Sequence, residues 1–196
     1  MDLELSPSQE ELVRAFSACL AKESSPERVR QAEPLGFDPG LWRRLADMGV
    51  PSLAVPEAAG GGGGGLLEAA LVCEAAGRHL APAPVVESLA AARALAGAGL
   101  LAGPAGEGVA SGRAVATLAL GPGLPQLVPA GAVAEVVVGR QGPDLAVWRR
   151  RPPGVAAPNF ASLPVAWLEP GPPAATVPGA GDRHQAARDE WLVLAG

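Results

Sequence analysis

The fold class can be predicted from one stretch, Ser111-Gly112-Arg113-Ala114-Val115-Ala116-Thr117-Leu118-Ala119-Leu120, because the spacing of apolar residues changes there. Before it, apolar residues recur every three or four positions, as they do on one face of a helix. From Ala114 onward they come in short continuous runs bounded by glycine and proline, which indicates buried β-strands. We therefore predict an α+β chain, in which an all-α helical bundle is followed by a small antiparallel β domain.

Four helices are predicted upstream of Ser111. Ser6 is placed to cap the first, with Pro7 at its first position and Gln9 three residues after the cap. Asp38 and Pro39 open another helix in the same way. The predicted helices lie near residues 7–22, 39–48, 66–77 and 84–96. Their alanine-rich sequences and short links favour a bundle.

Short strands are predicted downstream, near residues 114–120, 133–139 and 144–149, with a fourth candidate at 163–168. Asp182 is placed to cap a further helix that carries Ala186, Trp191 and Leu194, and we expect this helix to be exposed rather than packed. The chain then divides into an N-terminal helical domain (1–113), a middle β domain (114–179) and the start of a C-terminal helical domain (180–196).

Composition excludes several classes of function. The formal net charge is −5, which argues against a general affinity for nucleic acid or an anionic membrane. Two cysteines, Cys19 and Cys73, lie in apolar, helix-like surroundings, as expected in a reducing compartment. No apolar run has the length of a membrane span, and Met1-Asp2-Leu3-Glu4 lacks the basic start of a signal peptide. We expect a soluble, cytoplasmic protein.

The glycine run Gly60–Gly65 contains Gly-x-Gly-x-x-Gly and precedes a predicted helix. A dinucleotide-binding turn needs a strand before the glycines and a parallel strand after the helix, and neither is predicted here. We therefore interpret the run as a mobile, ligand-free surface loop, and keep a phosphate-binding loop as the less favoured alternative.

Other residues that could serve in catalysis or in phosphate or metal binding are better explained by structural roles. Cys73 and His79 are six positions apart, so one helix face does not bring them together as a nucleophile and base. The run Arg149–Arg151 is compatible with phosphate binding, but is more typical of a solvated strand end. The cysteines and histidines lack metal-ligand spacing, so no metal site is predicted.

The acids and tryptophans likewise give no catalytic assignment. We interpret Glu57, Glu68, Glu74 and Glu87 as surface or capping groups, and Trp148 and Trp167 as core residues of strands rather than cofactor stackers. No residue is assigned a catalytic or metal-binding role, and the cofactor-binding residues stay unknown.

The order of several motifs nevertheless resembles the flavin-dependent acyl-CoA dehydrogenase family. The resemblance covers residues 1–120 well and residues 124–170 weakly. It rests on Leu5-Ser6-Pro7-Ser8-Gln9, Leu41-Trp42-Arg43-Arg44-Leu45-Ala46-Asp47-Met48-Gly49, Leu53-Ala54-Val55-Pro56-Glu57, Gly60-Gly61, Glu74-Ala75-Ala76-Gly77-Arg78, Leu80-Ala81-Pro82-Ala83-Pro84, and Ser111-Gly112 before the strand at 115–120.

The resemblance implies a helical domain, a central β domain and a second helical bundle, with FAD as cofactor. It implies an oxidoreductase that forms the α,β double bond of an acyl-CoA thioester and works in homo- or hetero-oligomers. A carboxylate removes the α proton, and the β hydride passes to the flavin.

This sequence departs from the family where the flavin would bind. The family's Thr-Glu-Pro and Gly-Ser-Asp are replaced after Leu120 by Gly121-Pro122-Gly123. The β domain is therefore expected to be shortened, and the C-terminal bundle with its catalytic glutamate to be missing beyond its first helix.

Three interpretations follow from these departures. The chain is part of an acyl-CoA dehydrogenase, a degenerate non-catalytic partner subunit of an active one, or an interaction module without redox chemistry. In each case we predict that these 196 residues alone neither bind FAD tightly nor dehydrogenate an acyl-CoA.

Overall fold

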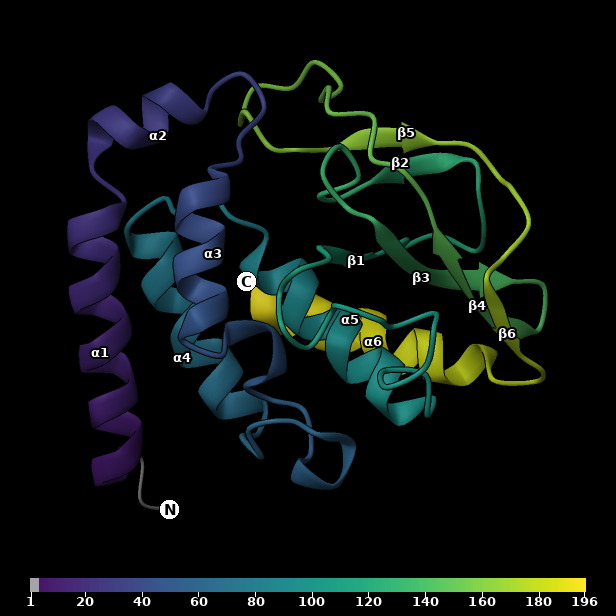
Figure 1. The fold of residues 1–196 in the computed structure, drawn as a ribbon, viewed down its shortest axis with the longest axis horizontal. Helices are drawn as coiled ribbons and strands as arrows, with labels where there is room; N and C mark the ends of the chain where they lie inside the picture. The colour runs from purple at the N-terminus through teal and green to yellow at the C-terminus, as the bar shows by residue number, and fades with distance from the viewer. Residues whose placement is uncertain (1–3) are drawn as a thin grey trace.

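Along the chain most helices precede the strands, as the change of apolar spacing predicts, and one helix follows them; the α+β fold class is confirmed (Figure 1). The computed structural model describes residues 4–196; Met1–Leu3, the start of the first predicted domain, lie outside the described residues. The helices are α1 (Pro7–Glu23), α2 (Pro26–Ala32), α3 (Pro39–Asp47), α4 (Leu66–Arg78), α5 (Val85–Gly97) and α6 (Gly181–Ala195), with 3-10 turns η1 (Val50–Ser52) and η2 (Glu57–Ala59). The strands are β1 (Ala116–Leu118), β2 (Gln126–Val128), β3 (Val136–Gln141), β4 (Asp144–Arg149), β5 (Ala166–Leu168) and β6 (Ala175–Val177).

The predicted helix starts at Ser6 and Asp38 are confirmed by their caps. The Ser6 hydroxyl accepts from the Gln9 backbone N–H, and the Gln9 side chain accepts from the Ser6 N–H, so the two form a capping box. The Asp38 carboxylate accepts from the backbone N–H groups of Gly40 and Leu41. These bonds satisfy backbone donors that a helix start leaves free.

Three elements were not predicted, and each is short. Helix α2 has no buried residue, so it leaves no apolar periodicity to detect. Strands β2 and β6 have three residues each, too few for an alternation of apolar and polar residues to stand out.

Two sheets form instead of one small antiparallel unit. The larger has the strand order β1-β3-β4-β6, and the smaller pairs β2 with β5. Strand β1 runs parallel to β3, with Ala116 opposite Val136, whereas the other pairs are antiparallel. Residues 119–135, which include β2, provide the long crossover that a parallel pair requires. The predicted antiparallel arrangement is therefore wrong for this one pair.

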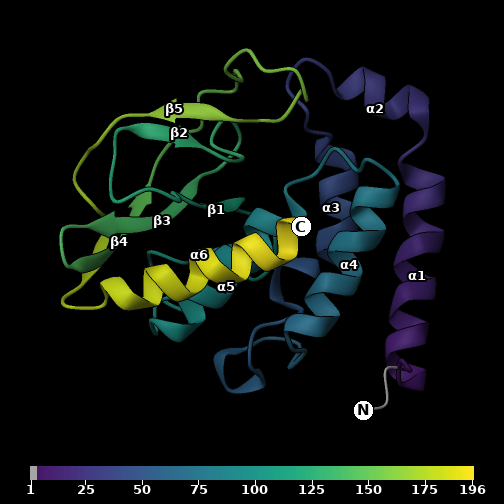
Figure 2. The same cartoon turned by 180° about the vertical axis from the view of Figure 1, so that it is seen from behind.

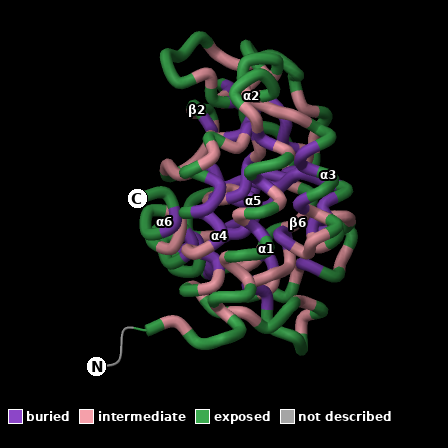
Figure 3. Tube along the Cα trace, turned by 90° about the vertical axis from the view of Figure 1, so that its left-hand side faces the viewer, coloured by how far each residue is buried: buried purple, intermediate pink, exposed green. Residues whose placement is uncertain are grey.

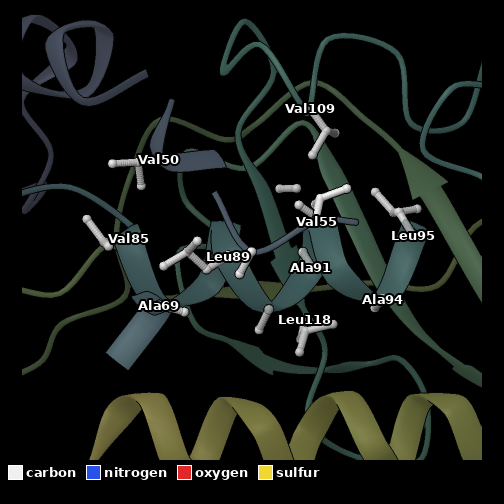
Figure 4. Close-up of a cluster of buried hydrophobic side chains, with 14 of the residues drawn as sticks. Val50, Val55, Ala69, Val85, Leu89, Ala91, Ala94, Leu95, Val109 and Leu118 are labelled. Carbon is white, nitrogen blue, oxygen red and sulfur yellow. The ribbon is translucent and has the colours of Figure 1, made fainter. Parts of the chain in front are cut away.

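Two hydrophobic clusters lie on opposite faces of the larger sheet. Val136 and Val138 of β3 face the helices, while Val137 faces the second cluster with Trp148 and Leu168. This alternation follows from the two-residue period of a strand. The first cluster joins Leu89 and Leu95 of α5 to Leu118 of β1, seen in close-up in Figure 4. Buried segments run through the centre of the molecule in Figure 3.

Helix α6 is packed, contrary to the expectation that it is exposed. It contacts α5, α4, β3 and β4, and lies alongside α5 beneath the sheets in Figure 2. His184, Ala187 and Leu194 are buried in this contact. The predicted cap is also wrong, because the helix begins at Gly181 and Asp182 lies within its first turn. Among residues 4–196, no helix has both the length and the apolar character needed to cross a membrane.

Candidate functional site

A pocket of about 590 Å³ lies where α4 ends and α5 begins. Residues 160–165, in the loop between β4 and β5, form a second wall, and the last turn of α6 forms a third. Most of the lining is aliphatic, with Val85, Val86 and Leu194 among its members. The volume is within the range of small-molecule sites, and the lining suits an aliphatic chain.

Polar side chains interrupt the apolar lining, among them Cys73 of α4, Glu87 of α5 and Trp191 of α6. Burial raises the pKa of the Glu87 carboxyl. Hydrogen bonds from its own backbone N–H and from the Trp191 side chain lower this pKa and so offset part of the rise. Burial likewise raises the pKa of the Cys73 thiol to about 12, and the nearby Glu87 adds to this shift. The pocket therefore favours a neutral carboxylic acid and a protonated thiol.

Glu87 was predicted to be a surface or capping group; it does lie in the first turn of α5, but it is buried in the pocket wall rather than at the surface. A signal for its burial was available in the sequence, because Glu87 is an isolated acid within the run Val85-Val86-Glu87-Ser88-Leu89-Ala90. Isolated acids in apolar helical runs are unusual, because the charged form is poorly solvated there. Glu68 is a capping group as predicted: it accepts from the Gly65 backbone N–H. Glu74 is exposed and pairs with Arg78, and Glu57 is exposed.

The glycine run is hydrogen-bonded rather than mobile. Gly60 to Gly64 donate their backbone N–H groups to the carbonyl oxygens of Glu57, Pro56, Ser52, Val55 and Leu53, respectively. The Gly65 N–H is 2.8 Å from the Glu68 carboxylate. Because all six N–H groups are used within the protein, they are not available to cradle a phosphate. The expectation of a floppy loop is wrong, and the phosphate-loop alternative lacks the donors it needs.

Cys73 and His79 are not arranged as a nucleophile and base. Cys73 is buried in the pocket wall, where its raised pKa disfavours a thiolate. His79 ends α4, and its carbonyl oxygen accepts from the Ser24 hydroxyl at 3.0 Å. Within residues 4–196, no three His, Cys, Asp or Glu side chains form a group that could hold a metal.

The three arginines at the end of β4, Arg149–Arg151, do not converge on one anion site. Arg149 donates to the Glu107 carbonyl oxygen at 2.9 Å and lies near the carbonyls of Pro104 and Ala105. Arg151 is exposed. Arg149 thus holds the loop at 104–107 against the end of β4, a structural role.

The two strand tryptophans differ in burial. Trp148 is buried, as predicted, and its indole N–H donates to the Gly171 carbonyl oxygen. Trp167 is 59% exposed, so its prediction as a core residue is wrong. It lies on β5 directly opposite Leu127 of β2, on the outer face of the smaller sheet.

The family resemblance implies that the loop after β1 would contact the flavin. Residues 119–125 carry no hydroxyl, carboxylate or cationic side chain, and two of them are prolines, which lack an N–H. The Gly121 N–H is already bonded to the Gln126 side chain at 2.7 Å. A flavin needs donors toward its ring and its phosphates. The residues present at this loop do not fit that cofactor.

Comparisons with known proteins agree with this architecture. Residues 6–102 match the family model described as acyl-CoA dehydrogenase, N-terminal domain. The chain is 34% identical over 168 residues to acyl-CoA dehydrogenase IpdE2 of Mycobacterium tuberculosis, covering 84% of this chain and 49% of that protein. It is 35% identical over 147 residues to IpdE2 of Mycolicibacterium smegmatis, covering 74% of this chain and 46% of that protein. The chain thus spans about half the length of these curated relatives.

A solved structure shares the fold over almost the whole chain. The structure of the ChsE4-ChsE5 complex from Mycobacterium tuberculosis superposes with a TM-score of 0.73 and 26% identity. The match covers 95% of this chain and 61% of that one. With the helical domain, the sheets and the motif order all in agreement, this chain belongs to the acyl-CoA dehydrogenase family.

Proposed function

We propose that these residues form the acyl-binding wall of an acyl-CoA dehydrogenase, an oxidoreductase that introduces the α,β double bond of an acyl-CoA thioester. The observation that carries the proposal is the 590 Å³ aliphatic pocket between α4, α5 and α6. In this role the chain binds and orients the acyl group and excludes water from it, while residues outside 4–196 supply the redox chemistry.

The second part of the proposal concerns which chain of the assembly binds the flavin. FAD is the cofactor that family membership implies, but the loop at 119–125 has no side-chain donor for it. We propose that a dehydrogenase-like partner chain holds the FAD, and that this chain acts as the non-catalytic partner. The ChsE4-ChsE5 structure is described as a complex, which supports an assembly of two different chains.

The setting proposed for this assembly is acyl-CoA metabolism in the cytoplasm. Both cysteines are free, although thiols in an oxidising compartment usually pair.

Flavin content and acyl-CoA binding test the proposal together. The chain is purified alone and with a candidate partner, and the flavin-to-protein ratio is measured from the absorbance bands of flavin. Calorimetry measures acyl-CoA binding to both samples. We expect the chain alone to be colourless, and the complex to be yellow and bleached by acyl-CoA.

A matched pair of variants tests the pocket. Val86 lines it and is half-buried, whereas Leu67 of α4 is outside it and 51% exposed. Val86→Phe fills part of the pocket and is expected to weaken acyl-CoA binding about tenfold or more, while Leu67→Phe leaves it unchanged. A chain that is yellow and bleached by substrate on its own contradicts the partner-held flavin. Failure of both samples to bind any acyl-CoA favours an interaction module without redox chemistry.

A further inference from the structure

Left-handed backbone conformations gather at one pocket of this chain. Among residues 4–196, the residues other than glycine with a positive φ are Leu80 (48°), Ala130 (52°) and Ser162 (49°). All three line the pocket between α4, α5 and α6. A residue with a Cβ is strained at such angles, and strained residues of this kind gather at ligand-binding sites. The shape of this pocket is therefore maintained against backbone strain.

Leu80 occupies a position where other helices of this chain have glycine. Helix α4 ends in a Schellman motif, in which the N–H groups of Leu80 and Ala81 donate to carbonyl oxygens of the last turn, both at 3.0 Å. The left-handed residue of this motif is usually glycine, and α3 and α5 are followed by Gly49 (φ 84°) and Gly99 (φ 72°). The Leu80 side chain is 73% exposed, so packing within the protein does not explain a leucine there. What distinguishes this position is that its side chain lines the pocket.

The loop between β4 and β5 presents two further apolar side chains at the same pocket. Phe160 is fully exposed and Leu163 is more than half exposed, yet both line the pocket, so they lie at its mouth. The amide nitrogen of Asn159 donates to the carbonyl oxygens of Ala157 and Leu163 at 2.9 and 3.0 Å, and its oxygen accepts from the Leu163 N–H at 2.9 Å. Phe160 is thus presented to solvent by a hydrogen-bonded loop.

Large apolar side chains around one opening are unfavourable in water and mark a surface that a ligand covers. The hydrocarbon of an acyl group has the complementary chemistry, because it buries such side chains without leaving polar groups unpaired. Building on the proposed acyl-binding function, we infer that Leu80, Phe160 and Leu163 form an apolar clamp at the mouth of the pocket, which closes over the hydrocarbon of a bound acyl-CoA. These three residues then contribute to specificity for the acyl group.

Calorimetry with octanoyl-CoA and with free CoA tests the clamp on the full chain, in the assembly in which it purifies. Leu80→Gly and Phe160→Ala are each expected to weaken octanoyl-CoA binding about tenfold, because a large apolar contact with the hydrocarbon is lost. Binding of free CoA, which has no acyl group, should stay within about twofold of the wild type. The controls are Leu67→Ala on α4 and Val155→Ala on the loop between β4 and β5, since both side chains are exposed and outside the pocket.

A second substitution at Leu80 separates the side chain from the backbone. Leu80→Ala also removes the clamp side chain but keeps a Cβ at φ 48°, whereas glycine adopts this angle without strain. We expect both variants to bind octanoyl-CoA equally weakly, and Leu80→Gly to unfold at a urea concentration about 0.5 M higher than Leu80→Ala. Equal urea midpoints would overturn the strained backbone from which the inference starts.

The remaining outcomes separate this inference from the function on which it rests. Absence of octanoyl-CoA binding by the wild type overturns both. Wild-type affinity in Leu80→Gly and Phe160→Ala overturns the clamp and leaves the acyl-binding pocket in place. An equal loss of affinity for octanoyl-CoA and free CoA overturns the assignment to the acyl group. Loss of a partner chain from Phe160→Ala, seen by size-exclusion chromatography, overturns the clamp in favour of a protein contact.

Discussion

At the scale of single residues, contacts with distant segments fix backbone conformations that sequence patterns do not predict. Gly61 is an example: six consecutive glycines suggest disorder, yet Gly61 fits closely against the backbone of Val55. A Cβ added at Gly61 would lie 2.2 Å from the Val55 carbonyl oxygen and 2.4 Å from its Cβ. Gly61 is therefore required by a close approach of two chain segments.

Gly61→Ala is accordingly expected to lower the free energy of unfolding by about 1–3 kcal/mol, because the added methyl group overlaps backbone atoms that cannot move independently. Gly77→Ala is the control, since Gly77 lies in α4 with open space around it. That change should stabilise the protein by about 0.5–1 kcal/mol through helix propensity. Urea unfolding of the two variants measures both effects. Equal stability of Gly61→Ala and the wild type would show that the loop moves away from Val55.

His184 is the second residue whose environment has a measurable consequence. Burial lowers its pKa, its contact with the Ala119 carbonyl opposes this, and Arg140 and Arg188 lower it further. Nε2 lies 2.7 Å from the Ala119 oxygen, so the neutral ring donates from this nitrogen. The unfolded chain therefore binds a proton at a higher pH than the folded chain does, and stability falls as the pH drops below about 6.5.

His184→Gln keeps an N–H donor but does not titrate. We expect its free energy of unfolding to fall less than that of the wild type between pH about 7 and pH about 5. The measurement is urea unfolding at a series of pH values, with His79→Gln as the control for the other histidine. Parallel pH profiles of His184→Gln and the wild type would refute a buried, neutral His184.

At the scale of elements, α6 is held to α5 by one well-defined ion pair within an apolar contact. Arg93 of α5 donates to both carboxylate oxygens of Glu190 of α6, at 2.8 and 2.9 Å, and also to the Ala54 carbonyl at 2.6 Å. The two side chains are only 23% and 29% exposed, so solvent screens them less than it screens a surface pair. One guanidinium thus joins three segments.

Arg93→Leu is expected to increase amide hydrogen exchange in α6, because Glu190 loses its hydrogen-bond partner and α6 is then held to α5 by apolar contacts. A destabilisation of about 1–2 kcal/mol is expected, allowing for the partial exposure of the pair. Arg78→Leu breaks the exposed pair with Glu74 within α4 and should change stability by less than about 0.5 kcal/mol. If exchange in α6 were the same in Arg93→Leu as in the wild type, apolar packing alone would hold the helix.

At the scale of the whole molecule, one hydrophobic cluster crosses the predicted domain boundaries. It contains Leu89 of the helical part, Leu118 and Val136 of the sheet, and Leu194 of α6. The division at residues 113 and 179 stays a prediction, and the helical and β parts share this core. The pocket between α4, α5 and α6 depends on the same arrangement, because segments far apart in the sequence form its walls.

Local sequence patterns were sufficient to predict the fold class, the family, and the starts of α1 and α3. These depend on local periodicity and on capping residues within four positions of each other, as at Ser6 and Gln9. The sequence also indicated the donor-poor loop after Leu120, because that conclusion depends only on which residue types are present.

Which residues come into contact could be learned from the folded structure and not from local patterns. In the folded chain Glu87 lines a pocket, the glycine run forms a hydrogen-bonded loop, and α6 packs against α5. Strand β1 pairs in parallel with β3, and Trp167 is exposed. Each outcome depends on contacts between residues distant in the chain, which set burial, pKa and hydrogen bonding but leave little trace in local spacing.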